Sequence, residues 1–237
     1  MPFGIGDDER ITSTTTDAGS PCRILVVDDH PIVLRGIVQI IDNEVGLEVC
    51  ATAQGADEAF EQARDTNPDL AVVDIDLRAG SGIELVKSFR QMKPEMPVLL
   101  LSMHEEEIYA ERGLRAGARG YIMKREAVSK IILAIRTILG GEIYLSKRMV
   151  SRLLQQYVTG RPSKDEGPYS NLTDRELEVF RLMGHGESVR QIAIRLCLSI
   201  KTVETYQSRL KSKLMLESNT VLSQHAIMWV TRDKSNL

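Results

Sequence analysis

The residues Asp69-Leu70-Ala71-Val72-Val73-Asp74-Ile75-Asp76-Leu77 give the clearest indication of the fold of this chain of 237 residues. Its apolar run, residues 70–73, is too short for a helix and ends in the carboxylate of Asp74. A Gly- and Ser-containing turn over residues 79–82 follows, and a helical pattern comes after it. A strand, a glycine-containing loop and a helix in this order place Asp74 at the carboxyl edge of a sheet, where open α/β sheets bind ligands.

Four other apolar runs predict strands, and helical patterns alternate with them. The expected strands cover residues 23–27, 47–51, 70–73, 98–102 and 119–122, and the expected helices cover 32–41, 56–65, 83–92, 106–115 and 127–139. Such alternation predicts an α/β doubly wound, five-stranded parallel sheet that helices cover on both faces.

The C-terminal part of the chain has only helical patterns. Thr173 and Glu176 form a capping box, which begins the first of four expected helices, over residues 174–183, 189–196, 200–214 and 218–230. The tight turn Cys197-Leu198-Ser199 separates the second helix from the third. This arrangement predicts an all-α, four-helix domain that contains a helix-turn-helix.

Composition divides the chain into segments. We expect a disordered polar tail over residues 1–20, an α/β domain over 21–140, a linker over 141–170 with a helix at 147–157, and the helical domain over 171–237. Residues 170–237 carry ten Lys and Arg against seven Asp and Glu, in a chain whose net charge is −3. A basic end on an acidic chain suggests nucleic acid as a partner.

Several features of the chain bear on its location. No apolar run reaches the ~18 residues that a membrane span requires, so we expect no membrane association. The N-terminus lacks the basic and apolar regions of a secretory signal. The three cysteines are far apart and without CxxC spacing, which fits a reducing, cytoplasmic location.

Carboxylates end two of the predicted strands. Asp28 and Asp29 follow the first strand and Asp74 ends the third, so all three converge at one sheet edge and require a cation among them. An oxygen-rich site of this kind suits Mg²⁺. We expect Asp29, Asp74 and the backbone carbonyl of Asp76 to be its ligands, and Asp28 to orient a bound water.

The same edge has the residues that phosphoryl transfer needs. Asp74 would attack an incoming phosphoryl group, while the metal and Lys124, which follows the fifth strand, would neutralise the transferred oxygens. Ser102 ends the fourth strand and supplies a hydroxyl there. We therefore expect Asp74 to be a phosphoryl acceptor.

These motifs resemble those of a known family. Residues 23–140 resemble a two-component receiver domain of flavodoxin-like fold, and residues 172–230 resemble the LuxR-type helix-turn-helix of NarL/FixJ-class response regulators. The residues that carry the resemblance are Val26-Val27-Asp28-Asp29-His30, Pro68-Asp69 through Asp74, Gly82, Leu101-Ser102, Gly117 through Tyr121, Lys124, Leu172-Thr173, Arg175-Glu176, Gly186, Ile192-Ala193, Ser199 and Lys201-Thr202-Val203. The chain departs from the family pattern at Arg78 and Arg125, where receivers usually or often carry proline.

The resemblance implies roles for particular residues and partners. Asp74 takes the acceptor role, Asp28 and Asp29 form the acidic pair, Ser102 and Tyr121 form the switch pair, and Lys124 pairs with the phosphate. The implied partners are a sensor histidine kinase, double-stranded DNA, RNA polymerase and, after phosphorylation, a second copy of the chain. The implied function is phosphorylation-dependent control of transcription, with no enzyme activity beyond self-phosphorylation from a donor and self-dephosphorylation.

The expected third helix of the C-terminal domain is the candidate for DNA recognition. Val203, Leu210 and Leu214 form its core stripe, which leaves a polar face for the groove. The candidate contacts to bases or phosphates are Lys201, Thr202, Thr205, Ser208 and Arg209, with Lys211 and Lys213 as phosphate contacts.

Three alternatives stay open at this point. Asp74-Ile75-Asp76 is similar to the DxD motif of haloacid-dehalogenase-type phosphatases, although Leu77 stands where Thr or Val is usual and no cap insertion follows. A phosphorylation-independent transcription factor is the second alternative, against which the complete acidic set argues. The third is control by a small-molecule ligand, for which an Asp cluster is not needed.

Overall fold

The computed structural model describes residues 20–77, 80–103, 106–159, 169 and 171–235. Residues 1–19 of the tail expected over 1–20, residues 160–168 and 170 of the expected linker, and Arg78 lie outside the described residues.

A five-stranded, fully parallel sheet forms the centre of the N-terminal domain, as the alternating pattern predicts. Its strand order is β2-β1-β3-β4-β5, so the chain reverses direction across the sheet between β1 and β3. In an open α/β sheet a ligand binds at such a reversal point, outside the carboxyl ends of the strands. The strands are β1 (Cys22–Val27), β2 (Leu47–Ala53), β3 (Leu70–Asp74), β4 (Val98–Ser102) and β5 (Gly120–Met123).

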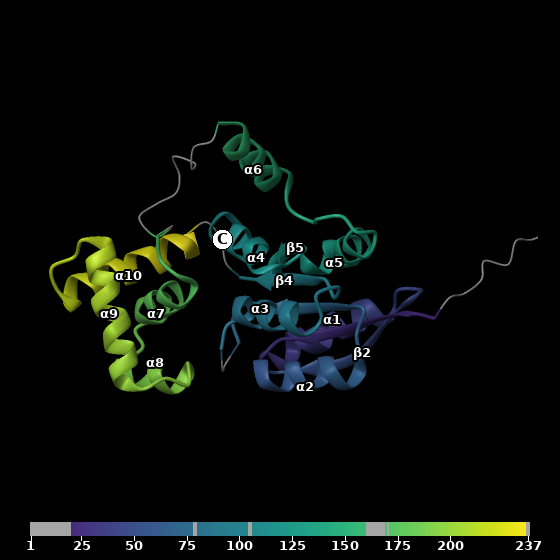
Figure 1. Cartoon of the computed structure of the whole chain (residues 1–237), viewed down its shortest axis with the longest axis horizontal. Helices are drawn as coiled ribbons and strands as arrows, with labels where there is room; N and C mark the ends of the chain where they lie inside the picture. The colour runs from purple at the N-terminus through teal and green to yellow at the C-terminus, as the bar shows by residue number, and fades with distance from the viewer. Residues whose placement is uncertain (1–19, 78–79, 104–105, 160–168, 170, 236–237) are drawn as a thin grey trace, which may run out of the picture.

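Helices cover both faces of this sheet, which is the doubly wound arrangement (Figure 1). Successive side chains of a strand point to opposite faces, so Ile24 and Val26 pack on one side while Leu25 and Val27 pack on the other. Helices α1 (Pro31–Asp42) and α5 (Lys124–Leu139) cover the first face. The second is covered by α2 (Ala56–Thr66), α3 (Gly82–Met92) and α4 (Glu106–Ala116).

Two details of these helices differ from the sequence prediction. Helix α5 begins at Lys124, immediately after β5, rather than at residue 127, so Lys124 is held by a helix. Helix α1 begins at Pro31, one residue earlier than predicted, and it buries Leu34, Ile37 and Ile41.

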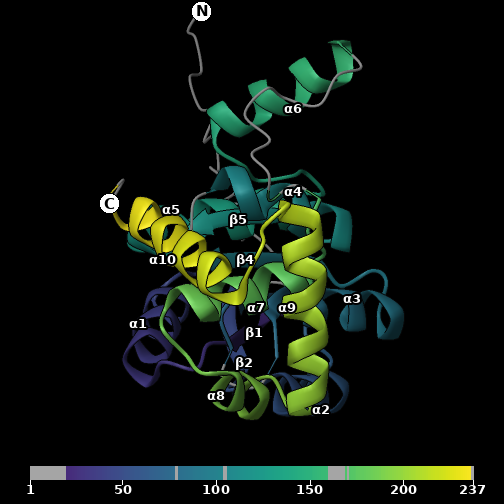
Figure 2. The same cartoon turned by 90° about the vertical axis from the view of Figure 1, so that its left-hand side faces the viewer.

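The C-terminal helices form a separate group that lies against one end of the sheet domain (Figures 1 and 2). They are α7 (Asp174–Gly184), α8 (Val189–Arg195), α9 (Ile200–Leu214) and α10 (Asn219–Ser235). The predicted capping box of Thr173 and Glu176 is present, and α9 begins and ends at the predicted residues. Val203, Leu210 and Leu214 are buried, which confirms the predicted core stripe of α9.

Helix α6 (Lys147–Thr159) stands between the two groups in the chain and includes the helix predicted over residues 147–157. Within the described part of the chain, no helix is long and apolar enough to cross a membrane.

Candidate functional sites at the sheet edge and on helix α9

The carboxylates of the N-terminal domain meet at the carboxyl ends of β1 and β3. These strands pair in parallel with Val27 opposite Val73, so Asp28 and Asp74 leave the sheet side by side. Asp28, Asp29 and Asp74 are each at most 4% exposed. The sequence prediction that these three side chains converge is therefore confirmed.

Lys124 connects two of the carboxylates. Its Nζ lies 2.7 Å from Asp74 Oδ2 and 2.7 Å from Asp28 Oδ2, and its side chain is only 9% exposed. The lysine is correctly oriented because it is the first residue of α5 and follows β5 directly. The pKa of Lys124 is raised, since its attraction to Asp74 and Asp28 outweighs the effect of burial, so the ammonium stays charged at neutral pH.

Burial has the opposite consequence for the acceptor candidate. It raises the pKa of Asp74 to about 7, and the repulsion from Asp76 and Asp28 adds to the increase while Lys124 opposes it. Near neutral pH a cation added to this site would therefore favour the ionised carboxylate.

The residues around Asp74 fit a bound cation. One oxygen of Asp74 bonds Lys124, while its Oδ1 is buried and has no hydrogen-bond partner among the described residues. Oxygen or nitrogen atoms of Asp28, Asp29, His30 and Asp74 all lie within 4.8 Å of one another. Carboxylate oxygens at this spacing suit a hard divalent cation.

His30 has no role among the predicted site residues, but it lies beside the carboxylates. Its Nδ1 lies 2.5 Å from Asp29 Oδ1 and 3.4 Å from Asp28 Oδ1, and its backbone N–H donates to Asp28 Oδ1 at 2.8 Å. Its place next to the Asp28-Asp29 pair is the one signal in the sequence that points to this position.

Ser102 and Tyr121 lie on the neighbouring strands β4 and β5, and Tyr121 stands opposite Leu100, two residues before Ser102. Asp74 pairs with Leu101, so Ser102 ends β4 one residue beyond it, and its side chain is fully buried. Tyr121 is 2% exposed and hydrogen-bonds to Ser102. Burial raises the pKa of Tyr121 well above its usual value, so the phenol stays protonated.

The loop after β3 is held tightly against the strand. The Ile75 N–H donates to Leu101 O at 2.9 Å and the Gly82 N–H donates to Ile75 O at 2.9 Å. A Cβ on Gly82 would collide with the carbonyl oxygen of Asp74, so this position requires glycine. The loop therefore holds Asp76 at a fixed place beside the acceptor candidate.

The two domains touch through α7. Asp174, at the start of α7, accepts from Lys87 of α3 at 2.8 Å and from Arg112 of α4 at 3.0 Å. Arg181, about two turns further along the same face of α7, pairs with Asp76 at 2.7 Å. These residues are not part of the predicted site, because nothing in their local sequence pattern distinguishes them from ordinary charged helix residues.

The candidate DNA-contact residues lie on the polar face of α9, which is on the far side of α7 from the sheet domain (Figure 1). Lys201, Thr205, Ser208 and Arg209 are exposed, and Thr202 and Lys211 are partly exposed. Because these residues come from a single helix, one surface can present all of them at once.

Lys213 differs from the other candidates. Its Nζ donates to Glu176 at 2.7 Å and to the carbonyl of Asn171 at 3.0 Å. Glu176 is 2% exposed and also accepts from the Thr173 backbone N–H, so Lys213 stabilises the cap of α7 from α9. Its ammonium is thus engaged within the domain.

Comparison with protein families divides the chain in the same way as the structure. A family described as "Response regulator receiver domain" matches residues 24–136, and one described as "Bacterial regulatory proteins, luxR family" matches residues 170–226.

Individual relatives extend this similarity over both domains. The chain is 32% identical to "Oxygen regulatory protein NreC" of Staphylococcus haemolyticus over 209 residues, which cover 86% of this chain and 96% of that protein. A LuxR-family two-component response regulator from Aurantimonas sp. is 34% identical with a TM-score of 0.55, over 59% of this chain and 99% of that one. RcsB of Salmonella enterica serovar Typhimurium, solved on promoter P1flhDC with phosphomimetic BeF3-, is 25% identical with a TM-score of 0.64, over 87% and 98%. These relatives favour neither the phosphatase alternative nor the phosphorylation-independent one.

Proposed function

We propose that Asp74 accepts a phosphoryl group in this chain. The chain belongs to the two-component response regulators of the NarL/FixJ class, which are phosphorylation-dependent, DNA-binding regulators of transcription. The observation that best supports Asp74 as the acceptor is the difference between the contacts of its two carboxylate oxygens. Oδ2 bonds the ammonium of Lys124, while Oδ1 is buried and lacks a hydrogen-bond partner among the described residues. One oxygen is thus held and the other is left for bond formation.

The transfer follows from these positions. An oxygen of Asp74 attacks the phosphorus of a phosphohistidine on a sensor histidine kinase, forming a P–O bond. The P–N bond breaks, and its electron pair remains on the imidazole of the kinase. Lys124, 2.7 Å from Asp74, stays charged and stabilises the transferred phosphoryl oxygens.

We assign a divalent metal site to the same edge. Asp29, Asp74 and the backbone carbonyl of Asp76 would hold the ion, and Asp28 would orient a water bound to it. A bound Mg²⁺ supplies positive charge against the phosphoryl oxygens. Asp28 also keeps Lys124 in place, through the 2.7 Å pair between them.

Ser102 and Tyr121 form the proposed switch. Their hydrogen bond links the end of β4 to β5, and a new phosphoryl oxygen beside Asp74 offers Ser102 a second acceptor. A shift of Ser102 toward it changes the packing of Tyr121 against α4, which carries the signal away from the site.

Helix α9 is the proposed reading helix for double-stranded DNA. We assign Lys201, Thr202, Thr205, Ser208 and Arg209 to bases or phosphates and Lys211 to a phosphate. Lys213 is the least favoured of the candidate phosphate contacts, because its ammonium already binds Glu176.

The remaining assignments concern the whole chain. We propose a receiver domain over residues 21–140, a linker over 141–170 and a DNA-binding domain over 171–237. Phosphorylation would favour a homodimer that matches two half-sites and acts with RNA polymerase in the cytoplasm. We assign no chemistry to the chain beyond gain and loss of its own phosphoryl group.

Phosphoryl uptake by variants tests the central assignment. Purified chain is incubated with Mg²⁺ and radiolabelled acetyl phosphate, and bound label is counted. Wild type and the control Asp57→Asn, a change at a solvent-facing position of α2, should take up label. Asp74→Asn should take up none, and uptake equal to wild type in this variant would refute Asp74 as the acceptor.

A further inference from the structure

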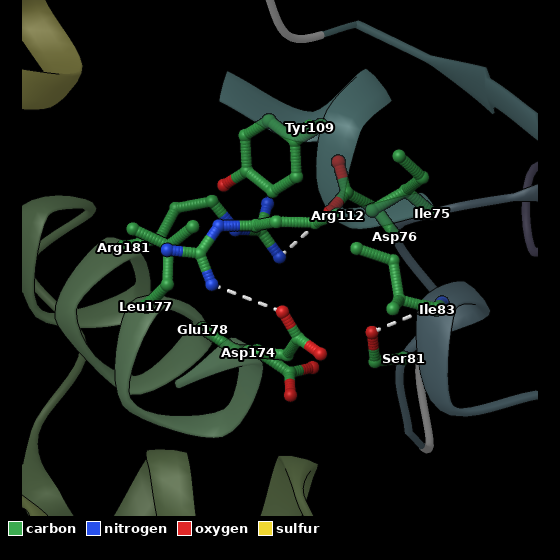
Figure 3. A pocket seen from close by; sticks show the side chains of 10 residues that line it. All are labelled: Ile75, Asp76, Ser81, Ile83, Tyr109, Arg112, Asp174, Leu177, Glu178 and Arg181. Atoms are coloured by element: carbon green, nitrogen blue, oxygen red, sulfur yellow. Dashed lines mark hydrogen bonds and ion pairs between the residues drawn. The ribbon is translucent and has the colours of Figure 1, made fainter. Parts of the chain in front are cut away.

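One face of α7 meets the receiver. Asp174, Leu177, Glu178 and Arg181 recur at helical spacing and line a pocket at the domain boundary. The receiver side of this pocket consists of the loop after β3, the start of α3 and one side of α4 (Figure 3). The DNA-binding domain therefore docks beside the phosphorylation site, while α9 stays on the outer side (Figure 2).

Arg181 reaches furthest into this boundary. Figure 3 shows its side chain extending from α7 to Asp76, while Arg112 extends the opposite way to Asp174. Nη2 of Arg181 lies 2.7 Å from Asp76 Oδ1, and the two side chains are 10% and 17% exposed. An ion pair this well buried depends strongly on both partners, because removal of either one leaves a charge without its counter-charge.

The charges around Arg181 belong to both domains. Burial disfavours its charged form, but Asp76, Tyr109, Glu178 and Asp74 together raise the pKa of Arg181 above its usual value. Asp74 itself feels Asp76, which raises the pKa of that carboxyl. An electrostatic connection thus runs from Arg181 through Asp76 to the acceptor.

Asp76 has a second connection to the acceptor, through the backbone. It stands two residues after Asp74, in the loop that Ile75 and Gly82 hold against the sheet. The proposed function assigns its carbonyl to the metal. A side chain held at 2.7 Å restricts the rotation of the Asp76 backbone, so Arg181 acts on the position of that carbonyl as well as on the local charge.

We propose that Arg181 is a positioning residue for phosphoryl transfer at Asp74, supplied by the DNA-binding domain and acting through Asp76. This inference rests on the proposed function of Asp74. The positive charge of Arg181 offsets the negative charge of the Asp76 carboxylate, which reduces the repulsion between the site and an anionic phosphoryl donor. Because coupling between two equilibria is reciprocal, the phosphoryl group and its metal also change how strongly α7 docks.

The second pairing at the boundary provides a matched control. Asp174 bonds Lys87 and Arg112 on the same face of α7, yet neither of these is a neighbour of Asp74 in the sequence or an assigned metal ligand. Asp174→Asn removes the contacts to Lys87 and Arg112 and keeps Arg181 available to pair with Asp76. Arg181→Gln weakens docking and exposes the Asp76 charge.

The test compares initial rates of phosphoryl uptake from acetyl phosphate by the full chain at saturating Mg²⁺, with the Mg²⁺ dissociation constant measured by calorimetry. Arg181→Gln should lower the rate by about three- to tenfold and change the Mg²⁺ dissociation constant. Asp174→Asn should leave both near wild type, and Arg181→Lys should recover part of the rate. In an Asp76→Asn background, Arg181→Gln should have no further effect.

Other outcomes overturn the inference. Equal losses of uptake rate in Asp174→Asn and Arg181→Gln would mean that docking alone matters. If the effects of Arg181→Gln and Asp76→Asn on the rate are fully additive, Arg181 does not act through Asp76. Thermal unfolding checks each variant, and Asp76→Asn breaks the same pair from the receiver side if Arg181→Gln does not fold. If Asp74→Asn blocks uptake while Arg181→Gln behaves as wild type, only this inference fails; if Asp74→Asn retains uptake, the acceptor assignment fails.

Discussion

The edge of the receiver sheet and the polar face of α9 are opposite kinds of site. At the sheet edge, Asp28 follows β1, Asp74 ends β3 and Lys124 begins α5, and both buried carboxylates already pair with the ammonium. On α9, Lys201 and Arg209 come from one helix and are exposed. The ion pairs of the first site form when the domain folds, so they contribute to its stability. The charged side chains of the second site form ion pairs with phosphates only when DNA binds. Substitutions at the first should therefore alter folding, and substitutions at the second should alter binding alone.

Loss of Lys124 tests this contrast with the largest expected effect. Lys124→Met leaves two buried carboxylates without their cation and should lower the free energy of unfolding by about 3–5 kcal/mol at pH 8 without Mg²⁺. Urea unfolding measures it. The control Lys130→Met changes a more exposed lysine of the same helix and should stay within about 0.5 kcal/mol of wild type. Similar losses in both would contradict a special role for Lys124.

The pH dependence of stability is the next test. The pKa of Asp74 is raised to about 7, so the folded state holds this proton more tightly than the unfolded state. The stability it contributes is present at low pH and is lost as pH rises through the folded pKa. Without metal, wild type should lose about 2–3 kcal/mol between pH 5 and pH 7 relative to Asp74→Asn. Parallel curves for the two proteins would contradict the raised pKa.

Lys213 combines features of both sites, because it lies on α9 but pairs with a buried carboxylate of its own domain. Lys213→Met should lower the free energy of unfolding by about 1–2 kcal/mol, since Glu176 loses its cation. Lys213 and the Thr173 backbone lower the pKa of Glu176 against the effect of burial, so this contribution is present at neutral pH and lost on acidification. Thermal unfolding at pH 7 and pH 4 measures it, and an unchanged stability at pH 7 would make Lys213 an ordinary surface lysine.

Lys201 should have the smallest effect on folding and a clear effect on binding. Lys201→Ala should weaken DNA binding by up to about tenfold and lower the slope of log affinity against log salt by about 1. Its free energy of unfolding should stay within about 0.5 kcal/mol of wild type. Fluorescence anisotropy with a labelled promoter fragment measures the slope, and Lys147→Ala on α6 serves as the control. An unchanged slope would remove Lys201 from the DNA contacts.

Local patterns were enough for most elements of the fold. The strand at Leu70 to Asp74, the cap at Thr173 and the bounds of α9 each depend on neighbours within a few residues, so the sequence could predict them. Predictions were less accurate where a boundary depended on tertiary contacts. Lys124 looked like a loop residue, but it begins α5, where its ammonium is fixed between two carboxylates from other strands.

The residues that gather at the sheet edge could be named from the order of strands in the chain. Parallel strands end at the same side, and Asp28, Asp29, Asp74 and Ser102 end or follow their strands. The packing of the helices in space, by contrast, brings Arg181 to Asp76 and Lys213 to Glu176. Both pairs link elements that are distant in the chain, and their partners are selected by how helices pack. A charged residue on a helix has the same local pattern whether it faces water, DNA or another domain.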